Sequence, residues 1–493
     1  MKTSLNGNIT LAFFLVLLAG VALSQEQPPA SPKTNPVPII KLKIHPKDEP
    51  SPALRYTLFP DTRELVHGNA AQAYYRAFSP DWISFMNNKE FTENQDKWLN
   101  GPLSELDESK IRFSSGMLEQ IHEATRKSYC DWDMYAKLRK DGFNMLLPDL
   151  QAMRHISRAL ALDCRLQLKK GNIEKALEDA KAGLTLSFHL GNSPTLIQGL
   201  VAIASGSIML PRLDEIIQQE KSPNLYWALT SLPRPLVDFR NCIGGEAIMM
   251  DHLFPGFREM LYSGKIKPLP NDELEKMQKL VADIVQLYGT TPPDSKKPLL
   301  KPLADTMFQA AMVANLIEAK KLLEEHGIKE ESLKNVSPLQ VVMMGEVLYY
   351  DKVCQDITKW NSIPYHIALA GIAKAEAGIK KPIPSIISPF PFKSLSALVA
   401  PAYKNVMNAS PRFERRIAML RTVEAIRLQA AKDKKWPETG DKITLVPLAQ
   451  DPYTGKPFQW KKDADKITLT GPAPDGENPT QQNTLIYELE LLN

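Results

Sequence analysis

The stretch KKGNIEKALEDAKAGLTLS, residues 169–187, is typical of a helix that packs closely against another helix. Gly171 allows the chain to turn before this helix, because glycine adopts left-handed backbone conformations without strain. Ala176, Ala180 and Gly183 are small and recur at helical spacing, so a neighbouring helix can approach closely. Together with the helical pattern that precedes residue 169, this stretch predicts a helical hairpin.

The hairpin resembles one tetratricopeptide repeat, through Gly171-Asn172 at the turn and Ala176-Leu177 on the second helix. One repeat length downstream, Leu210-Pro211 stands where a helix is required, and we expect the proline to break it. One repeat length upstream, Lys137 replaces the turn glycine. A solenoid needs about three copies to bury its faces. We therefore expect one repeat-like hairpin inside an irregular helical domain.

Helical spacing of apolar residues continues over residues 56–380, which predicts an α-helical domain. The segment DTRELVHGNAAQAYYRAF, residues 61–78, illustrates the pattern. Asp61 or Thr62 would cap a helix, and one apolar stripe would contain Val66, Ala70, Ala73 and Ala77.

Residues 194–210 are apolar on nearly all sides, which predicts a buried central helix. The alternative is a membrane-spanning helix. Its length disfavours it, because Pro211-Arg212 interrupts the apolar run well short of the ~20 residues that a bilayer requires.

The composition changes towards the C-terminus. Residues 381–409 are rich in proline and predict a connection, and residues 410–493 predict a separate module. Ser410 would cap a helix that starts at Pro411 and ends before Trp436. Four strand-like pieces follow, KITLVPL, PFQWKK, DKITLTG and TLIYELELL, with a turn at DPYTG, residues 451–455. The expected fold class is mainly α: an irregular helical-hairpin domain followed by a small α+β module with an antiparallel sheet.

The first residues have the pattern of a secretory leader. An apolar run over residues 9–23 follows Lys2 and ends in small residues, which predicts a signal peptide over residues 1–24 with cleavage between Ser24 and Gln25. The alternative is an uncleaved N-terminal membrane anchor. Residues 25–55 are rich in proline and predict a disordered tether. We therefore expect an exported protein of the periplasm or cell envelope, which touches the membrane only if the leader is retained.

Composition excludes several classes of function. The formal net charge is +4 on 493 residues, with acidic and basic residues interspersed, so we expect no nucleic-acid partner. The cysteines show no CxxC spacing, which argues against haem attachment and against a cysteine zinc site. The sequence leaves open whether they pair. We expect no metal and no cofactor. The cysteines are Cys130, Cys164, Cys242 and Cys354.

Several segments resemble parts of a family of uncharacterised secreted proteins from planctomycete-type bacteria. They are LYWALTSLPRPLVDFR (225–240), PTLIQGLVAIA (194–204) and, in the last third of the chain, KKWPET, PLAQDPYTGKPFQW and GPAPDG. The last ~80 residues also resemble the globular half of pseudopilins, in which a helix precedes a small sheet. The first resemblance implies a bacterial, exported protein of unknown activity, and the second implies a role in a surface assembly.

The sequence contains none of the common catalytic motifs. His122-Glu123 begins like a zinc-protease helix, but Arg126 replaces the second histidine of that motif, and no phosphate loop or serine elbow occurs. The densest polar cluster is Arg240, Glu246, Asp251 and His252. If these side chains faced one cleft, they could serve general acid–base chemistry; the alternative is an ordinary amphipathic helix.

Tyr226, Trp227 and Arg234 are candidates for a partner-binding surface, because aromatic residues and arginine are common at interface hot spots. The alternative for the two aromatic side chains is the protein core.

The favoured function is binding or scaffolding of an envelope protein or peptide. The alternatives are an envelope hydrolase whose site assembles only in three dimensions, and a component of pilin-like assemblies. The binding function needs an exposed apolar or aromatic groove, whereas the hydrolase needs Glu246, Asp251 or His252 in a concave pocket.

Overall fold

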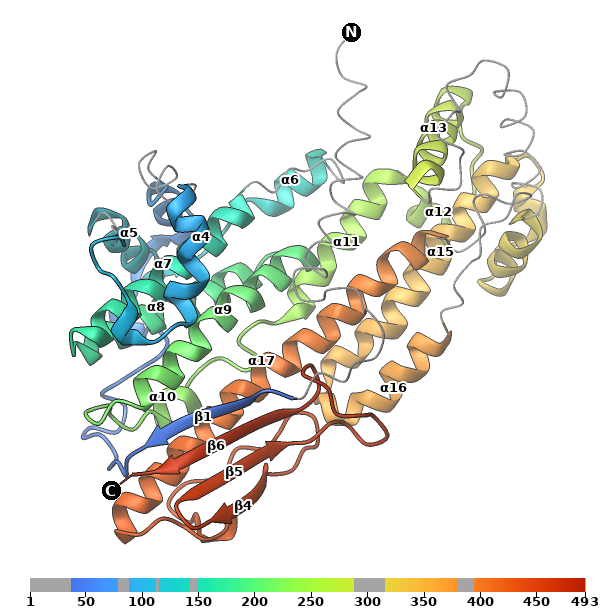
Figure 1. The fold of residues 1–493 in the computed structure, drawn as a ribbon. Coiled ribbons are helices and arrows are strands. Elements are labelled where there is room, and N and C mark those ends of the chain that lie inside the picture. Colours follow the sequence, from blue (N-terminus) through green and yellow to red (C-terminus); the bar gives the residue numbers. More distant parts are fainter. Residues whose placement is uncertain are drawn as a thin grey trace.

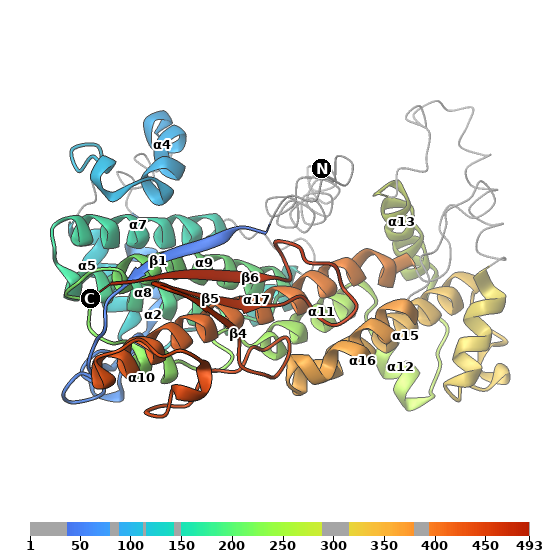
Figure 2. The ribbon, with the colours of Figure 1, turned by 60° about the horizontal axis from the view of Figure 1, so that its bottom comes forward.

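The structure is a computed structural model, and it describes residues 37–78, 88–111, 115–141, 149–287, 315–378 and 394–492. It confirms the predicted fold class, a mainly helical body with a small α+β module at the C-terminal end. The longest helix, α17 (Ser394–Asp433), lies between the sheet and the helices of the body (Figures 1 and 2). The predicted leader, with Ser24 and Gln25, lies outside the described residues.

The remaining elements follow in chain order. The helices are α2 (Ala70–Arg76), α4 (Lys89–Asn100), α5 (Ser115–Thr125), α6 (Met134–Asp141), α7 (Asp149–Lys169), α8 (Ile173–Gly191), α9 (Leu196–Ile217), α10 (Tyr226–Thr230), α11 (Phe239–Leu253), α12 (Phe257–Ser263), α13 (Asn271–Leu287), α15 (Pro338–Thr358) and α16 (Tyr365–Gly378). Short 3-10 turns are η1 (Thr62–Glu64), η2 (Leu103–Glu105), η4 (Glu330–Leu333), η5 (Lys359–Ser362) and η6 (Gly440–Lys442). The strands are β1 (Ile39–Ile44), β2 (Val66–Asn69), β3 (Lys127–Tyr129), β4 (Gln459–Asp463), β5 (Lys466–Gly471) and β6 (Leu485–Leu491).

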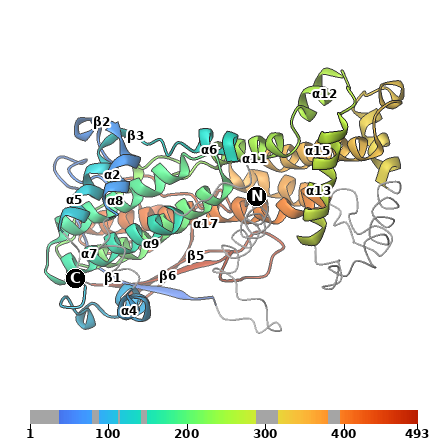
Figure 3. The ribbon, with the colours of Figure 1, turned by 90° about the horizontal axis from the view of Figure 1, so that it is seen from above.

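The predicted hairpin is formed by α7 and α8. Gly171 stands between them with a left-handed φ of 77°. Helix α9 packs beside both, and the three lie together at one end of the molecule (Figure 3). A Cβ at Gly183 would meet Met209 of α9 at 2.5 Å, so this contact requires glycine. On the other side of α9, a Cβ at Gly206 would meet Phe413 of α17 at 2.6 Å. The expected close packing of small residues is confirmed.

Pro211 lies inside α9 and does not end it, so the expected break is wrong. Helix α9 is buried between α8 and α17, and its packing compensates for the hydrogen bond that proline removes. By length and composition α9 is the one described helix that could cross a membrane, but 72% of its most apolar window is buried inside the protein. It is a core helix, as residues 194–210 predicted.

The main sheet has the order β1-β6-β5-β4. β4, β5 and β6 are antiparallel, as predicted, but β1 pairs with β6 in parallel. β1 lies within residues 25–55, so the tether prediction is wrong for this strand. Its sequence IIKLKI alternates: Leu42 and Ile44 are buried, while Lys41 and Lys43 form ion pairs with glutamates of β6. This alternation outweighs the prolines around it.

Three further boundaries differ from the sequence prediction. α17 is continuous from residue 394 through Ser410-Pro411, where we expected a connection to end and a helix to begin. KITLVPL, residues 442–448, forms no strand. Residues 61–78 form η1, β2 and α2 instead of one helix, although Ala70, Ala73 and Ala77 are buried as predicted. In each case, packing against distant segments overrides local sequence preference.

Candidate functional site

Two adjoining hollows lie where the helical body meets the C-terminal module. The first has a volume of about 500 Å³ and is lined by residues from four segments, 234–239, 360–366, 407–414 and 450–455. The second, about 590 Å³, lies against α16 and the strand ends of the module. Tyr365 and His366 line both hollows. We call the two together the junction groove.

The turn at residues 451–455 forms one wall of the groove. The backbone N–H of Gly455 donates to the Asp451 carbonyl at 2.8 Å, which closes the turn predicted from the sequence. The Asp451 carboxylate is fully buried and accepts from the Arg415 guanidinium of α17 at 2.6 Å. Gly455 has a φ of 65°, and a Cβ there would meet the His366 ring at 2.6 Å. The turn is therefore held against both α17 and the start of α16.

Trp360 and Asn361, in η5, also line the first hollow. The Trp360 indole packs on Gly371 of α16, where a Cβ would lie only 2.1 Å from the ring. The indole Nε1 of Trp360 and the amide Nδ2 of Asn361 are buried, and neither has a hydrogen-bond partner among the described residues. Both nitrogen atoms are hydrogen-bond donors. A buried donor without a partner costs about 1–3 kcal/mol. Both nitrogen atoms are inaccessible to solvent, so they lie behind the wall and are not presented to a molecule in the hollow.

The carboxylates that line the first hollow already have partners. Asp238 accepts three hydrogen bonds from the Arg240 guanidinium. Glu414 accepts the backbone N–H of Leu236 at 2.9 Å, and burial raises the pKa of Glu414 to about 7. Arg234, by contrast, is exposed and donates only to the Thr230 carbonyl, at 2.6 Å; it forms no ion pair with a described residue. Arg234 lowers the pKa of the Glu414 carboxyl group against the effect of burial, so the two charged groups of this hollow act on each other.

The three predicted partner-binding residues lie in different environments in the structure. Tyr226 is 1% exposed and donates its hydroxyl to the Pro447 carbonyl at 2.7 Å, so it belongs to the core. Trp227 is half-buried beside it, and its indole N–H donates to the Glu49 carboxylate. Both aromatic side chains contact the protein's own segments, and the burial of Tyr226 corrects its prediction as a binding residue. Arg234 lines the groove.

The polar cluster of α11 does not converge on a cleft. Glu246 is buried, accepts the Leu196 N–H at 3.2 Å, and has a pKa raised by burial to about 7. Asp251 faces solvent and pairs with Arg258, while His252 is exposed and Arg240 pairs with Asp238. None of the four lines either hollow. This arrangement agrees with the amphipathic-helix alternative.

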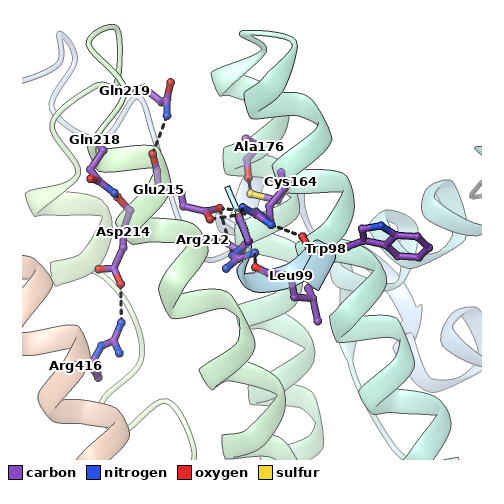
Figure 4. A network of polar contacts seen from close by, with 12 residues as sticks. Trp98, Leu99, Cys164, Ala176, Arg212, Asp214, Glu215, Gln218, Gln219 and Arg416 are labelled. Carbon is purple, nitrogen blue, oxygen red and sulfur yellow. Dashed lines mark hydrogen bonds and ion pairs between the residues drawn. The ribbon is translucent and has the colours of Figure 1, made fainter. Parts of the chain in front are cut away.

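A second concentration of charge lies inside the body, where α7, α9 and α17 meet (Figure 4). Arg212 donates to the Leu99 carbonyl at 2.6 Å and pairs with Glu215, while Asp214 pairs with Arg416 at 2.7 Å. The figure shows these side chains directed at one another and at backbone carbonyls. The network fixes helices to each other and lines neither hollow.

No group of three or more metal-binding side chains occurs among the described residues. The cysteines are all unpaired, and burial raises the pKa of Cys242 to about 12, so this thiol is inert.

Two of the segments that line the groove, within residues 225–240 and in the DPYTG turn, were recognisable as motifs in the sequence. Trp360 and Asn361 were missed, because they belong to no recognisable motif. Comparisons with protein families, with curated proteins and with solved structures find no match for this chain.

Proposed function

We propose that this chain is an exported protein of the bacterial cell envelope that binds an extended segment of a partner polypeptide in the junction groove. The observation that carries the proposal is a concave site at the junction, lined by apolar and aromatic side chains and by the exposed Arg234. An extended peptide presents side chains that such a surface can bury and free backbone carbonyls that a guanidinium group can bind.

The shape and composition of the groove support a peptide ligand. Binding sites of several hundred Å³ are lined mainly by apolar and aromatic groups, with few polar groups that fix orientation. Here Phe239, Trp360 and Tyr365 supply the aromatic surface. The binding interpretation calls for an aromatic groove, and the half-buried rings of Trp360 and Tyr365 support it, whereas Phe239 is buried.

Catalysis has less support. The residues suggested for acid–base chemistry are dispersed, and the carboxylates of the first hollow are engaged by the chain's own donors. No observation specifically favours a pilin-like assembly. We retain binding as the proposed function and the exported location as part of it, on the strength of the leader pattern in residues 1–24.

Site-specific photo-cross-linking in the protein's own cells tests this function. A photoreactive residue replaces Ile363, which lines the groove and is 39% exposed. The matched control replaces Leu445, which is 38% exposed and lies outside the groove. We expect a discrete adduct from position 363, mapped by mass spectrometry to one extended segment of the partner, and none from position 445. Equal adducts from both positions, or none from position 363, would contradict the proposal.

A further inference from the structure

We propose that Arg154, His155 and Arg158, on the N-terminal half of α7, bind a ligand that carries a phosphoryl group. The site lies outside both hollows of the junction groove, so the inference is independent of the proposed function. Two observations carry it. The three side chains have no partner in the protein, and the other half of the same stripe of α7 shows how such side chains are satisfied elsewhere.

The three basic side chains are neighbours on the helix surface. Arg154 and Arg158 are four residues apart, and His155 and Arg158 are three apart. All three are half-buried, and none forms an ion pair or donates a side-chain hydrogen bond within the part of the chain that the structure describes. Of their nitrogen atoms, only Arg154 Nε and His155 Nδ1 are closed to solvent, so the terminal guanidinium nitrogens and His155 Nε2 can reach a ligand.

The charge of this cluster has one sign. Burial lowers the pKa of Arg154 and that of His155, and the neighbouring Arg158 guanidinium lowers both further. Among the described residues, no carboxylate acts on either group in the opposite direction. Half-buried like charges are unfavourable in the free protein, and a bound anion would relieve their repulsion.

The same stripe of α7 continues with Arg165 and Lys169. At 3.6 residues per turn, Arg154, Arg158, Arg165 and Lys169 fall within about 60° of the helix surface. Arg165 donates to two backbone carbonyls at the end of α4 and pairs with Glu215, and Lys169 donates to carbonyls at η2. In this half of the stripe the protein supplies acceptor oxygens and a counter-charge. In the half that contains Arg154 and Arg158, the described residues supply neither.

The chemistry of the donors favours a phosphoryl group. Two guanidinium groups and an imidazole can engage several oxygen atoms at once, and arginine binds phosphate oxygens in bidentate geometry. A phosphate monoester offers three acceptor oxygens and nearly two negative charges at neutral pH. A carboxylate has two oxygens and one charge, so it would leave one guanidinium uncompensated. Free phosphate and the headgroup of a lipid share the phosphoryl chemistry.

Isothermal titration calorimetry of the full chain with inorganic phosphate, at constant ionic strength, tests the site. We expect one site per chain, with a Kd of about 1 mM or tighter. Acetate should bind at least about tenfold more weakly, because it has fewer oxygens and less charge.

Variants of α7 make the test specific. Arg154→Gln and Arg158→Gln should each weaken phosphate binding about tenfold, the effect of one lost hydrogen bond to a charged group. The control is Arg126→Gln, which removes an exposed positive charge just after α5. Far-UV dichroism confirms that each variant is folded, and either arginine variant of α7 suffices for the comparison.

Sedimentation with vesicles distinguishes the two sources of the phosphoryl group. Retention by vesicles that contain phosphatidic acid, but not by phosphatidylcholine alone, would identify a lipid headgroup if R154Q reduces it and R126Q does not. Phosphate binding without such retention would identify free phosphate or a phosphorylated small molecule.

Three results would overturn the inference. The first is no one-site binding of phosphate up to about 10 mM, a concentration well above the expected Kd. The second is equal affinity for acetate and phosphate, which would indicate a carboxylate ligand. The third is an equal loss of phosphate affinity in R126Q and R154Q, which would show that net charge alone attracts the anion.

Discussion

Glu246 shows how burial changes the chemistry of a single residue. Its carboxyl group is buried in the body and accepts one backbone N–H, from Leu196. Burial penalises the charged form and raises the pKa from 4.5 to about 7. The folded state therefore binds a proton more tightly than the unfolded chain, and the contribution of Glu246 to stability falls as the pH rises from about 4.5 through about 7.

We predict that Glu246→Gln removes this pH dependence. The variant should gain up to about 3 kcal/mol relative to the wild type between pH 5 and pH 8, because glutamine cannot ionise. Urea unfolding at the two pH values measures the difference. Glu325→Gln is the control, since Glu325 is solvent-exposed. A constant difference between E246Q and the wild type at both pH values would contradict the prediction.

Helix α16 is the element that shapes the groove. Its first turn contributes Tyr365 and His366 to both hollows, and Gly371, two turns later, supports the Trp360 ring. The position of the Trp360 ring therefore depends on the absence of a side chain at residue 371.

We predict that Gly371→Ala displaces the Trp360 ring and weakens ligand binding by about tenfold, although alanine favours helix. Gly378→Ala is the matched control on the same helix, because a Cβ at residue 378 would meet nothing within 4 Å. Tryptophan fluorescence reports the ring's environment, and fluorescence polarisation of a labelled peptide that contains the segment mapped by cross-linking reports binding. Unchanged fluorescence and affinity in G371A would show that the contact does not position the ring.

The sequence predicted helices and strands correctly where they depend on local periodicity and turn residues. The α7–α8 hairpin, the buried α9 and strands β4 to β6 follow from periodicity and turn residues. It failed for β1, whose partner β6 lies more than 400 residues away, and for α17, where tertiary packing holds a helix through Pro411. Local rules contain no information about such partners.

Buried polar contacts link the helical body to the C-terminal module. Asp214 of α9 accepts from Arg416 of α17 at 2.7 Å and from the Tyr487 hydroxyl of β6 at 3.0 Å. Glu424 and Arg427 of α17 form a fully buried pair, and Glu424 also accepts the Leu225 N–H. These contacts indicate that the two parts fold as one unit.

We predict that Asp214→Asn lowers the free energy of unfolding by about 3 kcal/mol, because it leaves Arg416 without its counter-charge. The transition should remain single, with far-UV dichroism and tryptophan fluorescence coinciding. Asp441→Asn, which removes an exposed pair with Lys442, should change stability by less than about 0.5 kcal/mol. Two separate transitions in the wild-type chain would show that the module folds independently.

The candidate site illustrates the same limit at the scale of the molecule. Arg234 and the DPYTG turn were visible in the sequence as motifs, but their proximity depends on the path of α17 between them. Trp360 and Asn361 carry no motif, and they line the hollow only because the fold brings η5 to residues 234–239 and 407–414. Tyr226 and Trp227 looked equally suited to an interface and instead pack against the module.

The most direct test of the groove is the indole N–H resonance of Trp360, one of seven tryptophans in the chain. Comparison of ¹⁵N–¹H TROSY spectra of the wild type and W360F assigns the signal, and W460F assigns the control. On addition of a peptide that contains the segment mapped by cross-linking, we predict that the Trp360 signal shifts because the ligand packs beside the Trp360 ring, while the Trp460 signal stays in place. A Trp360 signal that does not move at saturating peptide would contradict binding in the junction groove.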